Sequence, residues 1–230
     1  MKRFWKGVEL QQRDGGWAVL LDGRPVLTPA RAPLSMASRG LADGVAEEWR
    51  SVDEQIDPRE MPLTGFANAA VDRVAPDRQT FAAGLGRYAE ADLACYRSEW
   101  PPELVERQEA CWNPLLAWAR RRYDVDFATT SGLIHVPQPP ATVDRLLHEV
   151  TALDEFRLAG LSSLVTIGGS LIAGLAVIEK AMSAEEAWAA TSVDDRWQLE
   201  QWGSDPDAEQ ALGNRRRDFL AAARFLELLG

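Results

Sequence analysis

Two cysteines and two histidines are the side chains of this chain that could form a pair of thiol nucleophile and imidazole base. Cys95 or Cys111 could meet His135 in space, where the imidazole would take the thiol proton and leave a thiolate nucleophile. One hypothesis is therefore an enzyme that uses either cysteine as its nucleophile. The other is that both cysteines are small buried hydrophobic residues on helix faces, a common role of a free cysteine. We favour the second interpretation.

Other catalytic and ligand-binding motifs are incomplete in the sequence. None of the three lysines follows the glycines of a phosphate-binding loop. His148-Glu149 begins like a zinc-protease motif, but position 152 is alanine, so the second histidine ligand is missing. Gly168-Gly169-Ser170 does not match the glycine-serine-glycine turn of serine hydrolases. The 35 carboxylates are too many for any pair to be informative. We therefore expect no catalytic residue, no cofactor and no metal.

The composition sets limits on the possible partners. The 230 residues include 25 basic and 35 acidic side chains, a formal net charge of −10. Such a chain is a poor candidate for non-specific binding to nucleic acids or anionic membranes, which need clustered positive charge. The clusters Arg120-Arg121-Arg122 and Arg215-Arg216-Arg217 are local exceptions, and we interpret each as the solvated face of a helix.

The expected compartment is the cytoplasm of a bacterium. Two cysteines are too few for a disulfide framework, so reduced thiols are the expectation. The basic start, Met1 to Lys6, is not followed by the apolar stretch of a secretory signal. Arginine greatly outnumbers lysine, which is typical of a GC-rich genome.

One apolar segment allows a membrane-bound alternative. Leu158 to Ile178 carries no charge over 21 residues, which is long enough to cross a bilayer. Paired glycines and four hydroxyl side chains in its middle weaken it as a membrane span. A protein tethered to a membrane through this segment remains an alternative, and a helix buried in the core is the interpretation that we favour.

The first thirty residues have the pattern of β-strands. Apolar residues alternate around Trp17, Val19 and Leu21, and the dipeptides Asp14-Gly15 and Asp22-Gly23 favour tight turns. We expect a small antiparallel meander, too small to be stable without a helical partner. Its strands are expected near residues 3–11, 16–21 and 24–28.

From Ser38 onward the hydrophobic period changes to that of helices. Leu41, Val45 and Trp49 recur every fourth residue. Later helices are expected at 64–74, 103–112, 114–123, 142–153, 183–191 and about 207–229, with Pro114 kinking or restarting one of them. Ser183 and Glu186 have the spacing of a capping box. The expected fold is α+β, with a β-hairpin-rich subdomain at 1–35 and a helical subdomain at 36–230.

Three of the nine tryptophans lie close together near the end of the chain, at positions 188, 197 and 202. A helix from Ser192 to Gly203 would place Asp195, Leu199 and Trp202 along one stripe, and Arg196 near Glu200. At least one of the two later tryptophans is expected in the core. The segment is either a structural helix with an Arg196–Glu200 surface ion pair, or a docking surface of aromatic and carboxylate side chains.

Short motifs along nearly the whole chain resemble the ATP12 chaperone family, whose members assist assembly of the alpha subunit in the F₁ head of ATP synthase. Each motif is short, but their order and spacing over this length are specific. They are Arg3-Phe4-Trp5-Lys6, Leu21-Asp22-Gly23-Arg24-Pro25, Thr28-Pro29, Ala46-Glu47-Glu48-Trp49, Met61-Pro62-Leu63-Thr64, Asp72-Arg73, Asp92-Leu93, Tyr96-Arg97, Gln108, Trp112-Asn113-Pro114-Leu115-Leu116, Trp118 and Trp197-Gln198-Leu199-Glu200-Gln201-Trp202-Gly203.

The resemblance implies a non-enzymatic chaperone that acts without ATP. Members of the family bind the unassembled alpha subunit and shield its beta-facing surface until the beta subunit replaces the chaperone; the eukaryotic members are mitochondrial. The implied partner-binding residues are Glu200, with Trp197, Gln198 and Trp202 beside it. Asp195 is an expected contact as well, although many members have glutamate at that position. Trp5, Trp49, Trp112 and Trp118 are expected to pack in the interior.

Overall fold

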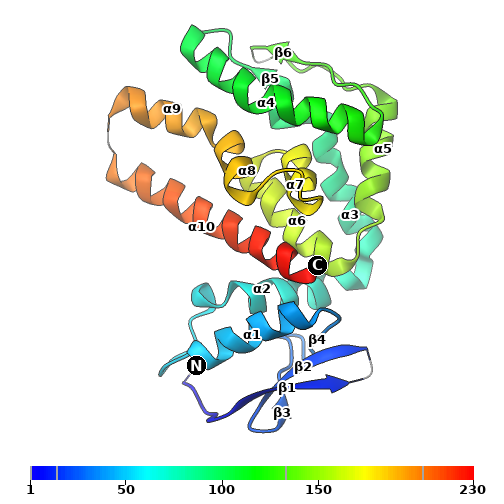
Figure 1. The fold of residues 1–230 in the computed structure, drawn as a ribbon, viewed down its shortest axis with the longest axis vertical. Helices are drawn as coiled ribbons and strands as arrows, with labels where there is room; N and C mark the ends of the chain where they lie inside the picture. Colours follow the sequence, from blue (N-terminus) through cyan, green and yellow to red (C-terminus); the bar gives the residue numbers. More distant parts are fainter. Residues whose placement is uncertain (1, 14, 133, 204) are drawn as a thin grey trace. The chain divides into compact units, whose positions relative to one another are not determined.

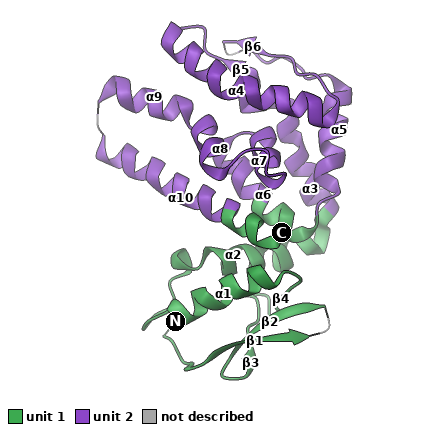
Figure 2. Cartoon of the chain, in the orientation of Figure 1, with its two compact units in different colours: residues 1–78, 154–160, 224–230 green, residues 79–153, 161–223 purple. Residues whose placement is uncertain are grey.

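The computed structural model describes residues 2–13, 15–132, 134–203 and 205–230 (Figure 1). An antiparallel sheet at the N-terminus is followed by a mostly helical chain, so the predicted α+β class is confirmed. The chain forms two compact units (Figure 2). The first contains residues 1–78, 154–160 and 224–230, and the second contains residues 79–153 and 161–223.

The sheet has the order β1-β2-β3, with β4 also pairing with β2. Its strands are β1 (Val8–Arg13), β2 (Gly16–Leu21), β3 (Arg24–Pro25) and β4 (Ser35–Met36). The turn between β2 and β3 has positive φ at Asp22 (48°) and Gly23 (78°), as the Asp-Gly dipeptide predicts. Of the other predicted turn, Asp14 lies outside the described residues, and Gly15 has a φ of 94°.

Two of the predicted strand boundaries were wrong. β1 begins at Val8 rather than near residue 3, because the N–H groups of Lys6 and Gly7 donate to the Asp22 carboxylate instead of to a strand. β3 ends at Pro25 rather than at residue 28, because the chain folds back on itself at Thr28, whose N–H donates to the Ala32 carbonyl at 2.9 Å.

Helix α1 (Arg39–Ser51) packs against the sheet. Ser38 caps it by accepting a hydrogen bond from the Leu41 N–H, and Leu41 and Val45 are fully buried in the core of the first unit. Phe225, near the C-terminus, belongs to the same core. The first unit therefore joins the sheet to helices and to C-terminal residues, which differs from the predicted division at residue 35.

Helix α2 (Pro62–Ala69) starts at a cap that a distant side chain supplies. Its N-cap residue, Met61, makes no side-chain capping bond. Instead the Glu48 carboxylate, on α1, accepts hydrogen bonds from the N–H groups of Leu63 and Thr64, both at 2.7 Å. Burial raises the pKa of Glu48, and these hydrogen bonds oppose the rise. The helical chain continues from α2 through a π-type turn at Ala70–Val74 and a 3₁₀ turn at Ala75–Asp77.

The second unit is built almost entirely from helices. Its long helix α4 runs from Pro102 to Tyr123, so the predicted separation into helices at 103–112 and 114–123 was wrong. Pro114 has no backbone N–H, so the helix loses one backbone hydrogen bond there. The side chains of Trp112, Leu115 and Leu116 on either side of it are buried, and their packing stabilises the helix across this position. The remaining elements of the whole chain are α3 (Arg78–Gly86), β5 (Tyr96–Arg97), β6 (Thr130–Ser131), α5 (Pro140–Thr151), α6 (Glu155–Gly168), α7 (Leu171–Ile178), α8 (Ala184–Thr191), α9 (Val193–Trp202) and α10 (Pro206–Leu229). Short 3₁₀ turns lie at 58–60 in the first unit and at 87–91 and 93–95 in the second.

The apolar segment Leu158–Ile178 is two helices rather than one. α6 ends at Gly168, Gly169 has a φ of 71°, and Ser170 caps α7 through the Ala173 N–H. Most of its large apolar side chains are buried, as the favoured interpretation predicts. No helix in the described parts of the chain is long and apolar enough to cross a membrane.

Asp92 holds the break between α6 and α7 in place. Its carboxylate is fully buried and accepts hydrogen bonds from the Ser170 hydroxyl at 2.8 Å and from the N–H groups of Ala94 and Ile172 at 3.0 Å. Burial raises the pKa of Asp92, and these donors oppose the rise. The α7 start is thus fixed by a residue about eighty positions earlier in the chain.

Candidate partner-binding surface

Helix α9 carries all five predicted site residues, and α8 and α4 position it. α8 begins with the predicted capping box, in which Ser183 and Glu186 each accept from the other's backbone N–H. α8 packs against α4, where the Trp112 Nε1–H donates to the Ala190 carbonyl at 2.8 Å. The Gln108 amide, also on α4, donates to Asp194 at 2.7 Å and so fixes the first turn of α9.

One face of α9 is tied to α4 by an arginine. The Arg107 Nη1 lies 2.6 Å from the Glu200 Oε2, and the side chains of both are about half exposed (45% and 51%). The guanidinium of Arg107 also lies over the Trp197 ring, 4.7 Å from its centroid. Trp197 and Glu200 therefore share one binding partner and one face.

The predicted Arg196–Glu200 surface pair was wrong. Glu200 pairs with Arg107, and Arg196 donates to the Ala189 carbonyl at 2.7 Å, near the end of α8. A neighbouring helix offers Glu200 a closer partner than its own helix does.

The opposite face of α9 lines a groove that α10 closes on the other side. The groove has a volume of about 540 Å³. Asp195, Leu199 and Trp202 all line it, so the predicted stripe is confirmed, and the exposed Gln198 lies beside them. The lining residues beyond α9 are Gly203, Asp205, Ala208, Ala211, Leu212 and Arg215.

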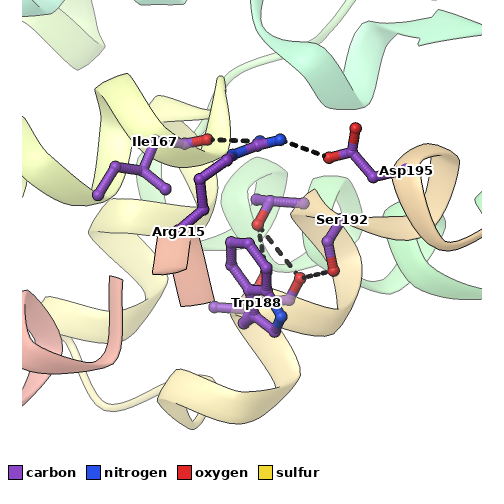
Figure 3. A network of polar contacts seen from close by, with 7 residues as sticks. Ile167, Trp188, Ser192, Asp195 and Arg215 are labelled. Atoms are coloured by element: carbon purple, nitrogen blue, oxygen red, sulfur yellow. Dashed lines mark hydrogen bonds and ion pairs between the residues drawn. The ribbon is translucent and has the colours of Figure 1, made fainter. Parts of the chain in front are cut away.

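The inner end of this groove is an ion pair between the two helices. Arg215 of α10 lies 2.8 Å from the Asp195 carboxylate and also donates to the Ile167 carbonyl at 3.1 Å (Figure 3). Its guanidinium lies 5.9 Å from the ring centroid of Trp188. Below it, the Ser192 hydroxyl donates to the Trp188 carbonyl at 2.7 Å and makes no capping bond to α9 (Figure 3).

A second, smaller hollow of about 350 Å³ lies between the same helices and α8. Leu199 and Leu212 line both hollows, and an ion pair between Arg216 and Glu185 is part of the second one. The two leucines therefore stand between the two hollows.

The two tryptophans of α9 are more exposed than predicted. Trp202 is 82% exposed and Trp197 is half-buried, so neither lies in the core. Trp202 is exposed because α9 ends directly after it, at Gly203 (φ 88°), and because α4 contacts the other face of α9, which carries Trp197. Trp5 and Trp112 are buried, and Trp49 and Trp118 are half-buried, as predicted for packing residues.

Cys95 does not have the environment of a nucleophile. Cys95 is buried, and burial together with the nearby Asp92 charge raises the pKa of its thiol to about 12. His135 has its Nδ1 2.9 Å from the Tyr96 hydroxyl and stacks on that ring. Among the residues that the structure describes, no cluster of three or more histidine, cysteine or carboxylate side chains could hold a metal ion.

Sequence reasoning missed Arg107 and the α10 side of the groove. Arg107 is 93 positions from Glu200, and no local pattern links them. Arg215 and Arg216 were interpreted only as a solvated face. They are indeed exposed, but each reaches a carboxylate on another helix.

The chain is similar over its whole length to proteins of known structure. The model of the ATP12 chaperone protein family matches residues 2–120. Atp12 from Paracoccus denitrificans is 43% identical, with a TM-score of 0.95 over 100% of this chain and 98% of that one. The protein Atu1473 from Agrobacterium tumefaciens is 36% identical, with a TM-score of 0.94 over 100% of this chain and 86% of that one.

A curated relative is more distant. The mitochondrial protein atp12 of Schizosaccharomyces pombe is 24% identical over 239 aligned positions, which cover 98% of this chain and 81% of the relative. Together with the family match and the two structures, this similarity extends over both compact units. The chain belongs to the ATP12 chaperone family.

Proposed function

We propose that this protein is an assembly chaperone for ATP synthase, which binds the unassembled alpha subunit of the F₁ head. It shields the beta-facing surface of that subunit until the beta subunit replaces it, and it needs no ATP to do so. The proposed site of action is the cytoplasm of a bacterium. The observation that carries the proposal is the similarity to Paracoccus denitrificans Atp12 over the whole chain.

The physical requirements of such a chaperone are modest. An unassembled subunit exposes an apolar interface that is prone to aggregate, and a partner that covers this interface favours the folded, soluble subunit. Release needs only a second partner that binds the same surface more tightly, so no bond chemistry is required. We therefore propose that the protein is not an enzyme.

The proposed client-binding residues are those of α9. Glu200 is exposed on the face of α9 that Arg107 contacts, and Gln198 and Trp202 are exposed on the opposite face, where they line the groove. Trp197 and Asp195 are half-buried and are proposed to hold the other side chains in position as well as to contact the client. Exposed tryptophan is frequent among the residues that dominate binding energy at protein interfaces, which supports this assignment.

The test is co-purification of the tagged chain with separately expressed alpha and beta subunits, with and without ATP. The expected result is a soluble complex with the alpha subunit alone, which addition of the beta subunit dissociates and which ATP does not change. Retention of neither subunit would contradict the proposal, and release by ATP alone would contradict its ATP independence.

A further inference from the structure

We infer that the groove between α9 and α10 takes one amphipathic helix of the client, with its apolar face on Leu199, Trp202 and Leu212 and a basic residue beside Trp202. This inference rests on the proposed function, because it assigns a docking site and a chemistry to the same client. It adds the inner face of α10 to the surface and states what kind of segment binds there.

The shape and lining of the groove suit a helix. Two helices form its walls, and its apolar lining consists of leucine, alanine and tryptophan side chains. Ala208 and Ala211 are small, so a partner can approach the α10 backbone closely. A groove of this kind between helices is the common receptor for the apolar stripe of an amphipathic helix. Its volume, about 540 Å³, accommodates several side chains of such a stripe.

The apolar lining of the groove is exposed to solvent. Trp202 is 82% exposed, Ala211 is exposed, and Leu199 and Leu212 are only half-buried. A tryptophan in water at a helix end contributes little to folding, and exposed apolar surface around it favours association. The walls are nevertheless held at a fixed spacing, because Arg215 joins α10 to Asp195 of α9.

The charge around the groove indicates that the bound helix carries a basic residue at its edge. Residues 193–212 contain six acidic side chains and one basic side chain. The basic cluster that follows is already paired, Arg215 with Asp195, Arg216 with Glu185 and Arg217 with Asp218.

The open end therefore keeps a surplus of carboxylates. Asp205 lines the groove there, next to Trp202 and Gly203, and Asp207 and Glu209 follow it on exposed positions of α10. A lysine or arginine of the client is attracted by these charges and by the face of the Trp202 ring.

The test uses a substitution that fills the groove and a matched control on the same helix. Ala211→Arg places a long charged side chain in the groove, whereas Asn214→Arg makes the same change in charge at an exposed α10 position outside the lining. Both positions are exposed, so both variants are expected to fold, which circular dichroism and thermal unfolding verify. We expect Ala211→Arg to weaken capture of the alpha subunit at least about tenfold, and Asn214→Arg to leave it within about twofold.

A photo-crosslinker shows what occupies the groove. It is attached to Ala211→Cys in a Cys111→Ser background, and Asn214→Cys serves as the control. The expected product joins the chaperone to an amphipathic, basic-edged helix of the alpha subunit, identified by mass spectrometry.

Three results would overturn the inference in distinguishable ways. If the wild-type chain captures the alpha subunit and Ala211→Arg captures it equally well, the groove is not the docking site, while the proposed function stands. A crosslink between two chaperone chains would make the groove a self-association surface. If the wild-type chain captures no alpha subunit, the proposed function fails and this inference fails with it.

Discussion

The guanidinium of Arg107 and the carboxylate of Glu200 form an ion pair at 2.6 Å between α4 and α9. The same guanidinium lies over Trp197, so a single arginine contacts both the Trp197 ring and the Glu200 carboxylate. If Glu200 also contacts the client, as proposed, its carboxylate exchanges the arginine of its own chain for a cation of the client. Substitution of the pair distinguishes a contact role of Glu200 from a positioning role.

We predict that Glu200→Lys folds normally and weakens capture of the alpha subunit at least about tenfold. Both partners are about half exposed, so loss of their ion pair changes the free energy of unfolding by at most about 1 kcal/mol. The capture assay with tagged chain and alpha subunit measures the effect. An unfolded variant would make Glu200 structural, and unchanged capture would remove it from the surface.

The charge-swapped variant Arg107→Glu with Glu200→Arg is the control for this prediction. It restores an ion pair between α4 and α9 but leaves an arginine where the client would meet a carboxylate. If Glu200 contacts the client, capture stays weak. Recovery of capture would show that Glu200 acts through Arg107, by holding α9 in position.

Removal of the buried carboxylate at Asp92 is expected to destabilise the second unit strongly. Asp92→Ala leaves the Ser170 hydroxyl and the N–H groups of Ala94 and Ile172 without their acceptor inside the protein. We predict a loss of about 3 kcal/mol or more in the free energy of unfolding. Urea denaturation measures it, with Asp144→Ala on the exposed face of α5 as the control, for which a change within about 0.5 kcal/mol is expected. Similar losses for the two variants would contradict the role of Asp92.

Glu48 makes the stability of the first unit depend on pH. Burial raises the pKa of Glu48 above 4.5, so between its unfolded and folded pKa values the folded chain holds the extra proton. Unfolding then releases a proton. The contribution of Glu48 to the free energy of unfolding is therefore complete when the pH is below the pKa of Glu48 in the unfolded chain, and it is lost as the pH rises through the pKa in the folded chain. The free energy of unfolding of the wild type minus that of Glu48→Gln is therefore expected to fall as pH rises.

Urea denaturation of both variants over a series of pH values tests this direction. Glu47→Gln, at the exposed neighbouring position, is the matched control. A difference that rises with pH would contradict the burial effect.

Cys95 is expected to react slowly with alkylating agents in the native protein. With a pKa of about 12, only about one thiol in ten thousand is ionised at pH 8, and burial blocks access as well. In a Cys111→Ser background, iodoacetamide is expected to modify Cys95 much faster in urea than in buffer. Equal rates would show an accessible, reactive thiol and would revive the hypothesis of a cysteine nucleophile.

Local patterns were sufficient for most helices, for the fold class and for the α9 stripe. The four-residue recurrence of Leu41 and Val45 predicts the buried face of α1, and the Ser183–Glu186 spacing predicts the capping box of α8, because both depend on residues within one or two turns. The Asp195–Leu199–Trp202 stripe follows from helical spacing in the same way. The family resemblance was likewise present in the residues themselves, since its motifs lie in order along the chain.

Contacts between distant segments were decided only by the tertiary structure. Whether Trp202 is buried depends on where α10 runs, and whether Glu200 pairs with Arg196 or Arg107 depends on how close α4 comes. The break of the apolar segment at Gly169 is held by Asp92, a residue far earlier in the chain. Sequence spacing determines which side chains share a face of one helix, but the partner of that face is chosen by packing between helices, which no local pattern encodes.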